Sequence, residues 1–141
     1  MSTDCMVMRK GKSSGRYVHF GARPKVMLKI LLDLSHEHGY LDMVKTIVDD
    51  NIYGWSYIDP TYEDRSKNVS SNRFKVVEGY GLAYSGTDVP ESNITIGSVE
   101  YSYVFDNTGN IEVYRYNKLL GAMDVTHPMA SQQIAMIDML I

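Results

Sequence analysis

Apolar side chains recur at helical spacing over residues 24–50, and Gly39 interrupts the pattern. Pro24 suits the first turn of a helix, where its missing N–H costs nothing, and Gly39 suits the left-handed backbone that often ends one. Because about two residues join the two helical stretches, we expect an antiparallel helix pair. The apolar positions are Val26, Met27, Ile30, Leu31 and Leu34 in the first stretch and Leu41, Val44, Ile47 and Val48 in the second.

Alternation of apolar and polar residues predicts strands before and after this helical region. Residues 5–20 contain two short strand-like runs around a Gly/Ser turn, which is a hairpin pattern. Residues 74–84 alternate as a single further strand. A last helix is expected to begin near Pro128 and to run to the C-terminus, because proline is common in the first turn of helices.

The most distinct hairpin pattern lies in the last third of the chain. Residues 94–105 and 111–120 flank the turn Asn107-Thr-Gly109, so we expect the two segments to pair as antiparallel strands. Side chains alternate between the two faces of a strand, and opposite residues contact one another. The pattern therefore predicts aromatic contacts across this hairpin, between Tyr101 and Tyr103 on one strand and Tyr114 and Tyr116 on the other.

The order of these elements predicts an α+β fold: an antiparallel meander sheet, an antiparallel helix pair and a C-terminal helix. A chain of 141 residues suits one domain, which we place over residues 1–141. The last helix is apolar around most of its circumference, and one sheet face covers only part of it. Met136 and Met139 are then left for a second chain, so we expect a homo-oligomer with this helix in its interface.

Composition places the chain among ordinary globular proteins. Hydrophobic residues make up 44% of the sequence and charged residues 22%, which excludes disorder of the whole chain. Cys5 is the only cysteine and cannot form an intramolecular disulfide. The first residues are polar and basic, unlike a signal peptide, and no apolar run approaches the length of a membrane helix. We therefore expect a soluble, cytoplasmic protein without a membrane association.

A net charge of −3 conceals an asymmetry, because residues 1–30 contain seven basic side chains and one acidic one. Either an anionic partner or pairing within the fold accounts for such a segment. The turn in residues 11–15 lacks the spacing of a nucleotide-binding P-loop, but its backbone N–H groups could cradle a phosphate. A pI near 5.7 makes nucleic acid an unfavourable main partner. The basic candidates for a phosphate site are Arg9, Lys10, Lys12 and Arg16.

The sequence contains no recognisable catalytic or metal-binding motif. A nucleophilic role for Cys5 would need a base such as His19, and a buried, inert strand cysteine is the simpler interpretation. His36 and His38 are two residues apart on a helix and point to different sides, so they are not expected to hold a metal together. We expect them to stabilise the C-terminal end of the helix, where positive charge is favourable. We expect no cofactor, and a small enzyme of unknown type is the least favoured class.

Four aromatic residues with polar groups concentrate within residues 53–62. Tyrosine and tryptophan are common in binding hot spots and stack on nucleobases, although a strand packed in the core has the same composition. Our leading hypothesis is a non-enzymatic binding protein, an inhibitor or accessory factor, that contacts a protein partner through this segment. The alternative is a protein that binds a nucleotide or another phosphate-bearing ligand at the basic hairpin. The aromatic candidates are Tyr53, Trp55, Tyr57 and Tyr62.

Overall fold

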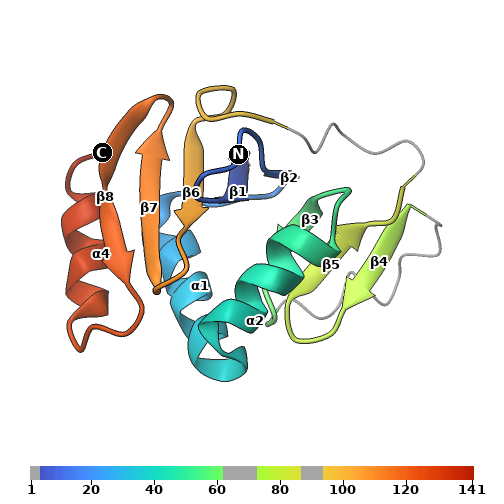
Figure 1. Cartoon of the computed structure of the whole chain (residues 1–141), viewed down its shortest axis with the longest axis horizontal. Coiled ribbons are helices and arrows are strands. Elements are labelled where there is room, and N and C mark those ends of the chain that lie inside the picture. Colours follow the sequence, from blue (N-terminus) through green and yellow to red (C-terminus); the bar gives the residue numbers. More distant parts are fainter. Residues whose placement is uncertain (1–3, 62–72, 87–93) are drawn as a thin grey trace.

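A computed structural model describes residues 4–61, 73–86 and 94–141, within which eight strands form one sheet (Figure 1). The strand order is β4-β5-β3-β2-β1-β6-β7-β8, so β4 and β8 are the edges and the first strand lies inside. The strands are β1 (Cys5–Arg9), β2 (Arg16–Val18), β3 (Trp55–Ile58), β4 (Phe74–Val77), β5 (Gly81–Tyr84), β6 (Tyr101–Phe105), β7 (Asn110–Arg115) and β8 (Lys118–Asp124). The helical segments are α1 (Pro24–His38), α2 (Tyr40–Val44), the π-helix η1 (Lys45–Asp50) and α4 (Ala130–Asp138).

Both predicted hairpins are confirmed, but the first strand of the second hairpin is shorter than the predicted segment 94–105, because β6 begins at Tyr101. β1 and β2 pair antiparallel around the Gly/Ser turn, and β6 and β7 pair antiparallel around residues 106–109. The predicted aromatic contacts across the second hairpin were wrong, because Tyr114 lies opposite Ser102 in the register. Tyr114 therefore packs with Met6 and Met8 on one face of the sheet, whereas Tyr103 belongs to the core on the other face.

The expectation of a purely antiparallel meander was also wrong, because the sheet is mixed. β1 runs parallel to β6, and β2 runs parallel to β3. The helical segments between Val18 and Trp55 form a crossover connection, which returns the chain to the same end of the sheet and makes β2 and β3 parallel. β6, β7 and β8 form an antiparallel meander at one end of the sheet.

Two segments predicted as single strands are hairpins. Residues 74–84 contain β4 and β5, and the second segment, 111–120, contains β7 and the start of β8. Positive φ angles reverse the chain at both places: Gly79 has a φ of 78° and Tyr116 a φ of 52°. Tyrosine rarely adopts such a φ, and the turn signal at the second reversal is limited to Asn117, the residue that follows it.

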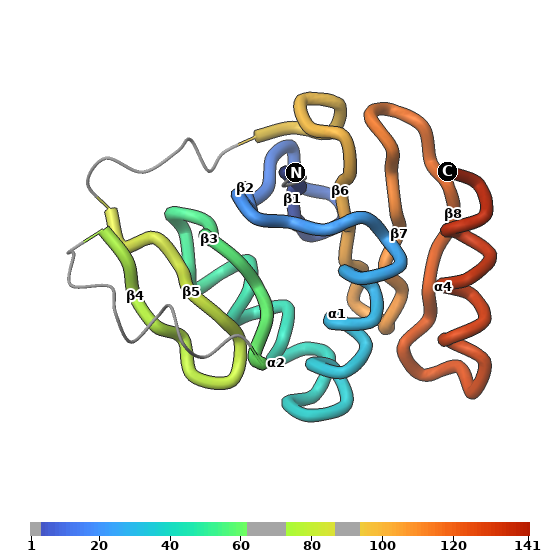
Figure 2. The backbone as a smooth tube through the Cα atoms, turned by 180° about the vertical axis from the view of Figure 1, so that it is seen from behind, coloured from blue at the N-terminus to red at the C-terminus, as the bar shows by residue number. Residues whose placement is uncertain are grey.

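The helical segments lie against the sheet and share one buried apolar cluster with it. α1 ends where expected, and Gly39 has a φ of 88°, which favours glycine. The antiparallel packing of the second helical stretch against the first stays a prediction. Seen from behind, α4 lies alongside β8 at the opposite end from β4 (Figure 2). Leu28 of α1, Met43 of α2, Ile47 of η1 and Ile134 of α4 all belong to the cluster.

Candidate functional site

The aromatic candidates do not share one surface. Tyr53 is 44% exposed, whereas Trp55 is fully buried and Tyr57 is half-buried. The pairing of β3 with β5 shifts register between Trp55 and Tyr57, so the simple alternation of strand faces does not hold there. Tyr62 lies outside the described residues. The expected aromatic binding surface is therefore reduced to Tyr53, while Tyr57 belongs to a different feature.

Trp55 and Arg16 both help to close the C-terminal end of η1. The last carbonyls of a helix have no partner within it and need donors from elsewhere. The Trp55 indole Nε1–H donates to the carbonyl of Ile47 at 2.9 Å, and Arg16 Nε donates to the carbonyl of Val48 at 2.8 Å. Two residues that the sequence suggested for binding therefore hold the crossover helix against the sheet.

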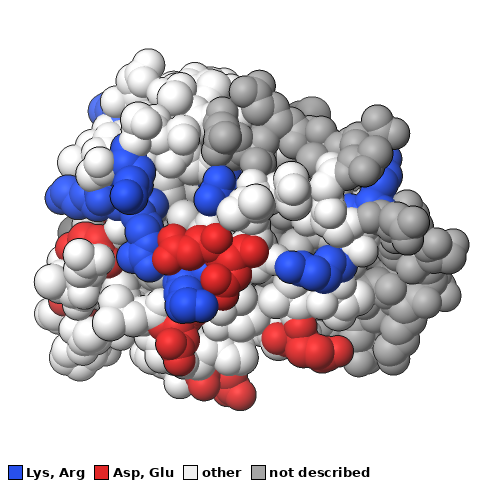
Figure 3. Space-filling view, turned by 45° about the vertical axis from the view of Figure 1, so that its right-hand side comes forward, with Lys and Arg blue, Asp and Glu red and all other residues white. Residues whose placement is uncertain are grey.

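Two of the four basic residues of the hairpin, Arg9 and Lys10, pair with acidic residues of the same chain. Arg9 donates two hydrogen bonds to the carboxylate of Asp49, and Lys10 Nζ lies 3.1 Å from a carboxylate oxygen of Glu112. The hydrogen bond from Arg9 lowers the pKa of Asp49. On the face shown in Figure 3, basic and acidic side chains adjoin one another. Pairing within the fold thus accounts for much of the charge asymmetry.

Lys12 differs from its neighbours in this hairpin. It is exposed and has no ion-pair partner within residues 4–61, 73–86 and 94–141. A polar hollow of about 280 Å³ lies beside it, between the hairpin turn and the end of η1. Asp49 forms part of the wall, so a bound anion would face one carboxylate as well as the basic groups. The other lining residues are Arg9, Ser13, Ser14, Arg16 and Val48.

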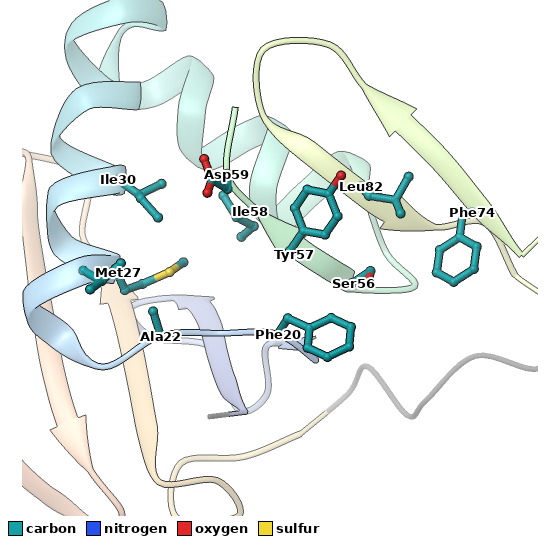
Figure 4. Close-up of a pocket in the computed structure, with 11 residues that line it drawn as sticks. Phe20, Ala22, Met27, Ile30, Ser56, Tyr57, Ile58, Asp59, Phe74 and Leu82 are labelled. Carbon is teal, nitrogen blue, oxygen red and sulfur yellow. The ribbon is translucent and has the colours of Figure 1, made fainter. Parts of the chain in front are cut away.

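An apolar pocket of about 420 Å³ lies between the start of α1 and the strands β3, β5 and β4 (Figure 4). Pockets for small ligands have this size and a mostly apolar lining with a few polar groups. Four separate segments contribute side chains to it, and none of them is a recognisable motif. The lining residues are Phe20, Ala22, Val26, Met27, Ile30, Ser56, Tyr57, Ile58, Asp59, Phe74 and Leu82.

Backbone pairing positions the floor of this pocket. Phe20 follows β2, and its N–H donates to the carbonyl of Ser56 at 2.7 Å, which fixes the segment before α1 against β3. Met27 and Ile30 are three residues apart on α1, so they face the pocket from adjacent turns. Phe20 and Val26 are each 50% exposed, which places apolar surface at the rim. The pocket is therefore open to solvent and partly lined by exposed apolar groups.

Asp59 contributes the single carboxylate in the lining that the structure describes. Its Oδ1 accepts hydrogen bonds from the N–H of Thr61 at 2.9 Å and from the Thr61 hydroxyl at 2.7 Å. Within the described ranges, Oδ2 has no hydrogen-bond donor. The guanidinium of Arg73 lies 5.7 Å from the centroid of the Phe74 ring, but Arg73 is not among the residues that line the pocket.

The nucleophile and metal candidates are occupied with structural contacts. Cys5 is fully buried, and burial raises the pKa of its thiol to about 12, which disfavours the reactive thiolate. His36 Nε2 lies 3.3 Å from the carbonyl of Val125, and His38 stacks on the ring of Tyr80 at 4.3 Å. Among the residues that the structure describes, no three His, Cys, Asp or Glu side chains converge as a metal site.

Comparison of the chain with protein-family models, with curated proteins and with solved structures finds no match. None of the helices in the described ranges has both the length and the apolar character needed to cross a membrane.

Sequence reasoning missed most of the pocket, including Phe20, Ile30 and Phe74. Phe20 carried one usable signal, since it is an aromatic residue between a short strand and the Gly21–Pro24 turn. The other two residues occupy ordinary apolar positions of a helix and a strand. Their shared surroundings follow only from the strand order.

Proposed function

We propose that the protein is a non-enzymatic binding protein that takes up a small apolar ligand in the pocket between α1 and the strands β3, β4 and β5. The observation that carries this proposal is an open cavity of about 420 Å³ whose walls are mostly apolar. Burying apolar ligand surface there would be favourable by about 25 cal/mol per Å², before the entropy of association is subtracted. Tyr57 is the residue of the aromatic segment that takes part.

Fluorescence titration with the neutral dye N-phenylnaphthylamine tests this proposal, because the dye brightens in apolar surroundings. The wild-type protein should bind the dye with a saturable signal. Ile30→Trp should fill the cavity from α1 and weaken binding at least about tenfold, a change of roughly 1.4 kcal/mol. Leu119→Trp is the matched control, since Leu119 is exposed on β8 and lies outside the pocket. Equal binding by both variants would contradict the proposal.

Capture of a protein partner through the aromatic segment has less support. Its central residue, Trp55, is buried and holds the carbonyl of Ile47. Tyr53 and its neighbour Ile52 are exposed by 44% and 48%. A protein partner would therefore have to contact these two residues or insert an apolar side chain at Phe20.

A second candidate function, the binding of a phosphate group, rests on the polar hollow beside Lys12. A basic side chain without a carboxylate partner in the described ranges lies there with two serine hydroxyls. Titration with inorganic phosphate, followed by NMR shifts of the residues 11–15, tests this candidate. Lys12→Gln should abolish the shifts, whereas Lys10→Gln should preserve them because Lys10 is paired with Glu112. Shifts that persist in Lys12→Gln would reject the candidate.

A further inference from the structure

The pocket has one sign of charge, and this limits the ligands that it can accept. Its lining contains eight apolar or aromatic residues, the hydroxyl-bearing Ser56 and Tyr57, and the carboxylate of Asp59. In the part of the chain that the structure describes, neither a lysine nor an arginine lines the pocket. A ligand carboxylate or phosphate would thus meet like charge at Asp59, and the described lining supplies no cation to compensate it, which is unfavourable.

The geometry of Asp59 suits a cationic donor. Thr61 occupies Oδ1 through two hydrogen bonds and so fixes the orientation of the carboxylate. The second oxygen is left without a donor in the described ranges. In Figure 4 the carboxylate lies at the end of the pocket towards Ile30 and Ile58, and the rings of Phe20 and Phe74 lie at the far end. The cavity therefore has an apolar end and an anionic end.

We infer that the pocket selects apolar amines: ligands whose ring or short alkyl chain lies among Phe20, Phe74 and Leu82 and whose ammonium group pairs with Asp59. This inference rests on the proposed ligand-binding function and adds the chemical class of the ligand. An ammonium group is a strong donor to a carboxylate, and the apolar walls exclude some of the water that would otherwise screen the pair.

Three ligands of one shape and different charge test the inference: phenylbutylamine, phenylbutanol and phenylbutyrate. Dissociation constants are measured by calorimetry or NMR titration at neutral pH. We expect the amine to bind about tenfold more tightly than the alcohol, as a charge-assisted hydrogen bond would provide, and the carboxylate to bind more weakly than either. Raising the salt concentration should reduce the preference for the amine.

Asp59→Asn separates charge from shape, because the amide keeps an Oδ1 acceptor for Thr61. The amine should lose its advantage of about tenfold in this variant, and binding of the alcohol should be unchanged. Asp33→Asn is the matched control on α1, since Asp33 is exposed and pairs with Lys29 outside the pocket. A thermal unfolding transition in each variant checks that both variants fold.

The possible failures are distinguishable. If the amine and the alcohol bind equally to the wild type, the pocket binds apolar ligands but the inference about charge is wrong. If Asp59→Asn weakens the alcohol as much as the amine, Asp59 acts through the fold of the pocket and the inference is again overturned. If none of the three ligands nor the neutral dye binds, the proposed function itself is rejected.

Discussion

Arg9 and Asp49 lie face to face, and two nitrogens of the guanidinium donate to the two carboxylate oxygens at 2.9 and 2.7 Å. The pair joins the first hairpin to the end of the crossover helix, far along the sequence. Both side chains are partly exposed, at 25% and 42%, so water and salt weaken their attraction. Because two hydrogen bonds fix both side chains, the pair holds β1 and η1 in a defined position relative to each other.

A double-mutant cycle of Arg9→Gln and Asp49→Asn measures this contact. We expect a coupling energy of about 0.2–1 kcal/mol in urea unfolding at low salt, which is the range for exposed ion pairs. The coupling should shrink towards zero in molar salt. The same cycle on Lys29 and Asp33, a pair within one helix, is the control for purely local effects. A vanishing Arg9–Asp49 coupling at low salt would show that the pair does not join the two elements.

Asp106 organises the turn between β6 and β7. Its Oδ1 accepts hydrogen bonds from the N–H groups of Thr108, Gly109 and Asn110 at 2.8, 3.0 and 2.9 Å. Partial burial raises the pKa of this carboxyl, but the hydrogen bonds from Thr108 and Asn110 outweigh burial and lower it to about 2. We expect Asp106→Ala to destabilise the fold by about 1–3 kcal/mol, because several N–H groups lose a charged acceptor.

The pH dependence of that loss follows from the lowered pKa. A carboxyl whose pKa falls on folding stabilises the protein fully above its unfolded value of 3.8, and this contribution disappears as the pH falls towards 2. The free-energy difference between wild type and Asp106→Ala should therefore shrink below pH 4. Asp106→Asn, which keeps one acceptor oxygen but no charge, should lie between the two at pH 7. A difference that stays constant down to pH 2 is incompatible with this explanation.

Gly39 stands at the end of α1 with a φ of 88° and no heavy atom within 4 Å of the position of an added Cβ. Gly39→Ala should therefore strain the backbone without causing a clash and destabilise by roughly 1 kcal/mol in thermal or urea unfolding. Glu37→Ala, two residues earlier on an exposed position, serves as the control and should change stability by less than about 0.5 kcal/mol. Equal effects of the two variants would count against a conformational role for Gly39.

Exposed apolar side chains on α4 and directly after it predict self-association of the protein. Met136 is 67% exposed, Met139 85% and Leu140 61%, while Ile134 and Ile137 are buried against the fold. We predict a homodimer or higher assembly through these exposed side chains. Light scattering at tens of micromolar checks it, and Met136→Lys should yield a 16.0 kDa monomer. Met129→Lys, outside the helix, should leave the assembly intact; a monomeric wild type refutes the prediction.

Local patterns in the sequence predicted the ends of the first helix and the first turn, but not the reversals within residues 74–84 and 111–120. Pro24 and Gly39 mark the ends of α1, and the Gly/Ser turn lies between β1 and β2. Another local pattern could have been used: an aspartate followed two residues later by threonine. In each of three such places the aspartate Oδ1 accepts hydrogen bonds from the N–H and hydroxyl of the threonine, which is a turn geometry. These pairs are Asp59 with Thr61, Asp106 with Thr108 and Asp124 with Thr126.

The parts that sequence reasoning did not predict depend on distant neighbours. Nothing near Cys5 indicates that it will pair with Tyr101, and the parallel order of β2 and β3 depends on the path of the crossover. The pocket has the same origin, since Phe20 and Phe74 approach it from different segments. The residues singled out for their chemistry were misleading for a physical reason: Trp55 and Arg16 are polar enough to cap helix carbonyls, and a folded chain needs such donors.

The inner position of β1 also affects how the chain is made. β1 can pair at once with β2, which directly follows it, but its other neighbour, β6, is synthesised much later. Until Phe105 has emerged, one side of β1 presents unpaired N–H and C=O groups, and its fully buried side chains Cys5, Met6 and Val7 lack part of their cover. Pairing over such a sequence distance is slow. Nascent chains of this protein should therefore be unusually dependent on chaperones, and fragments that end before Tyr101 should aggregate.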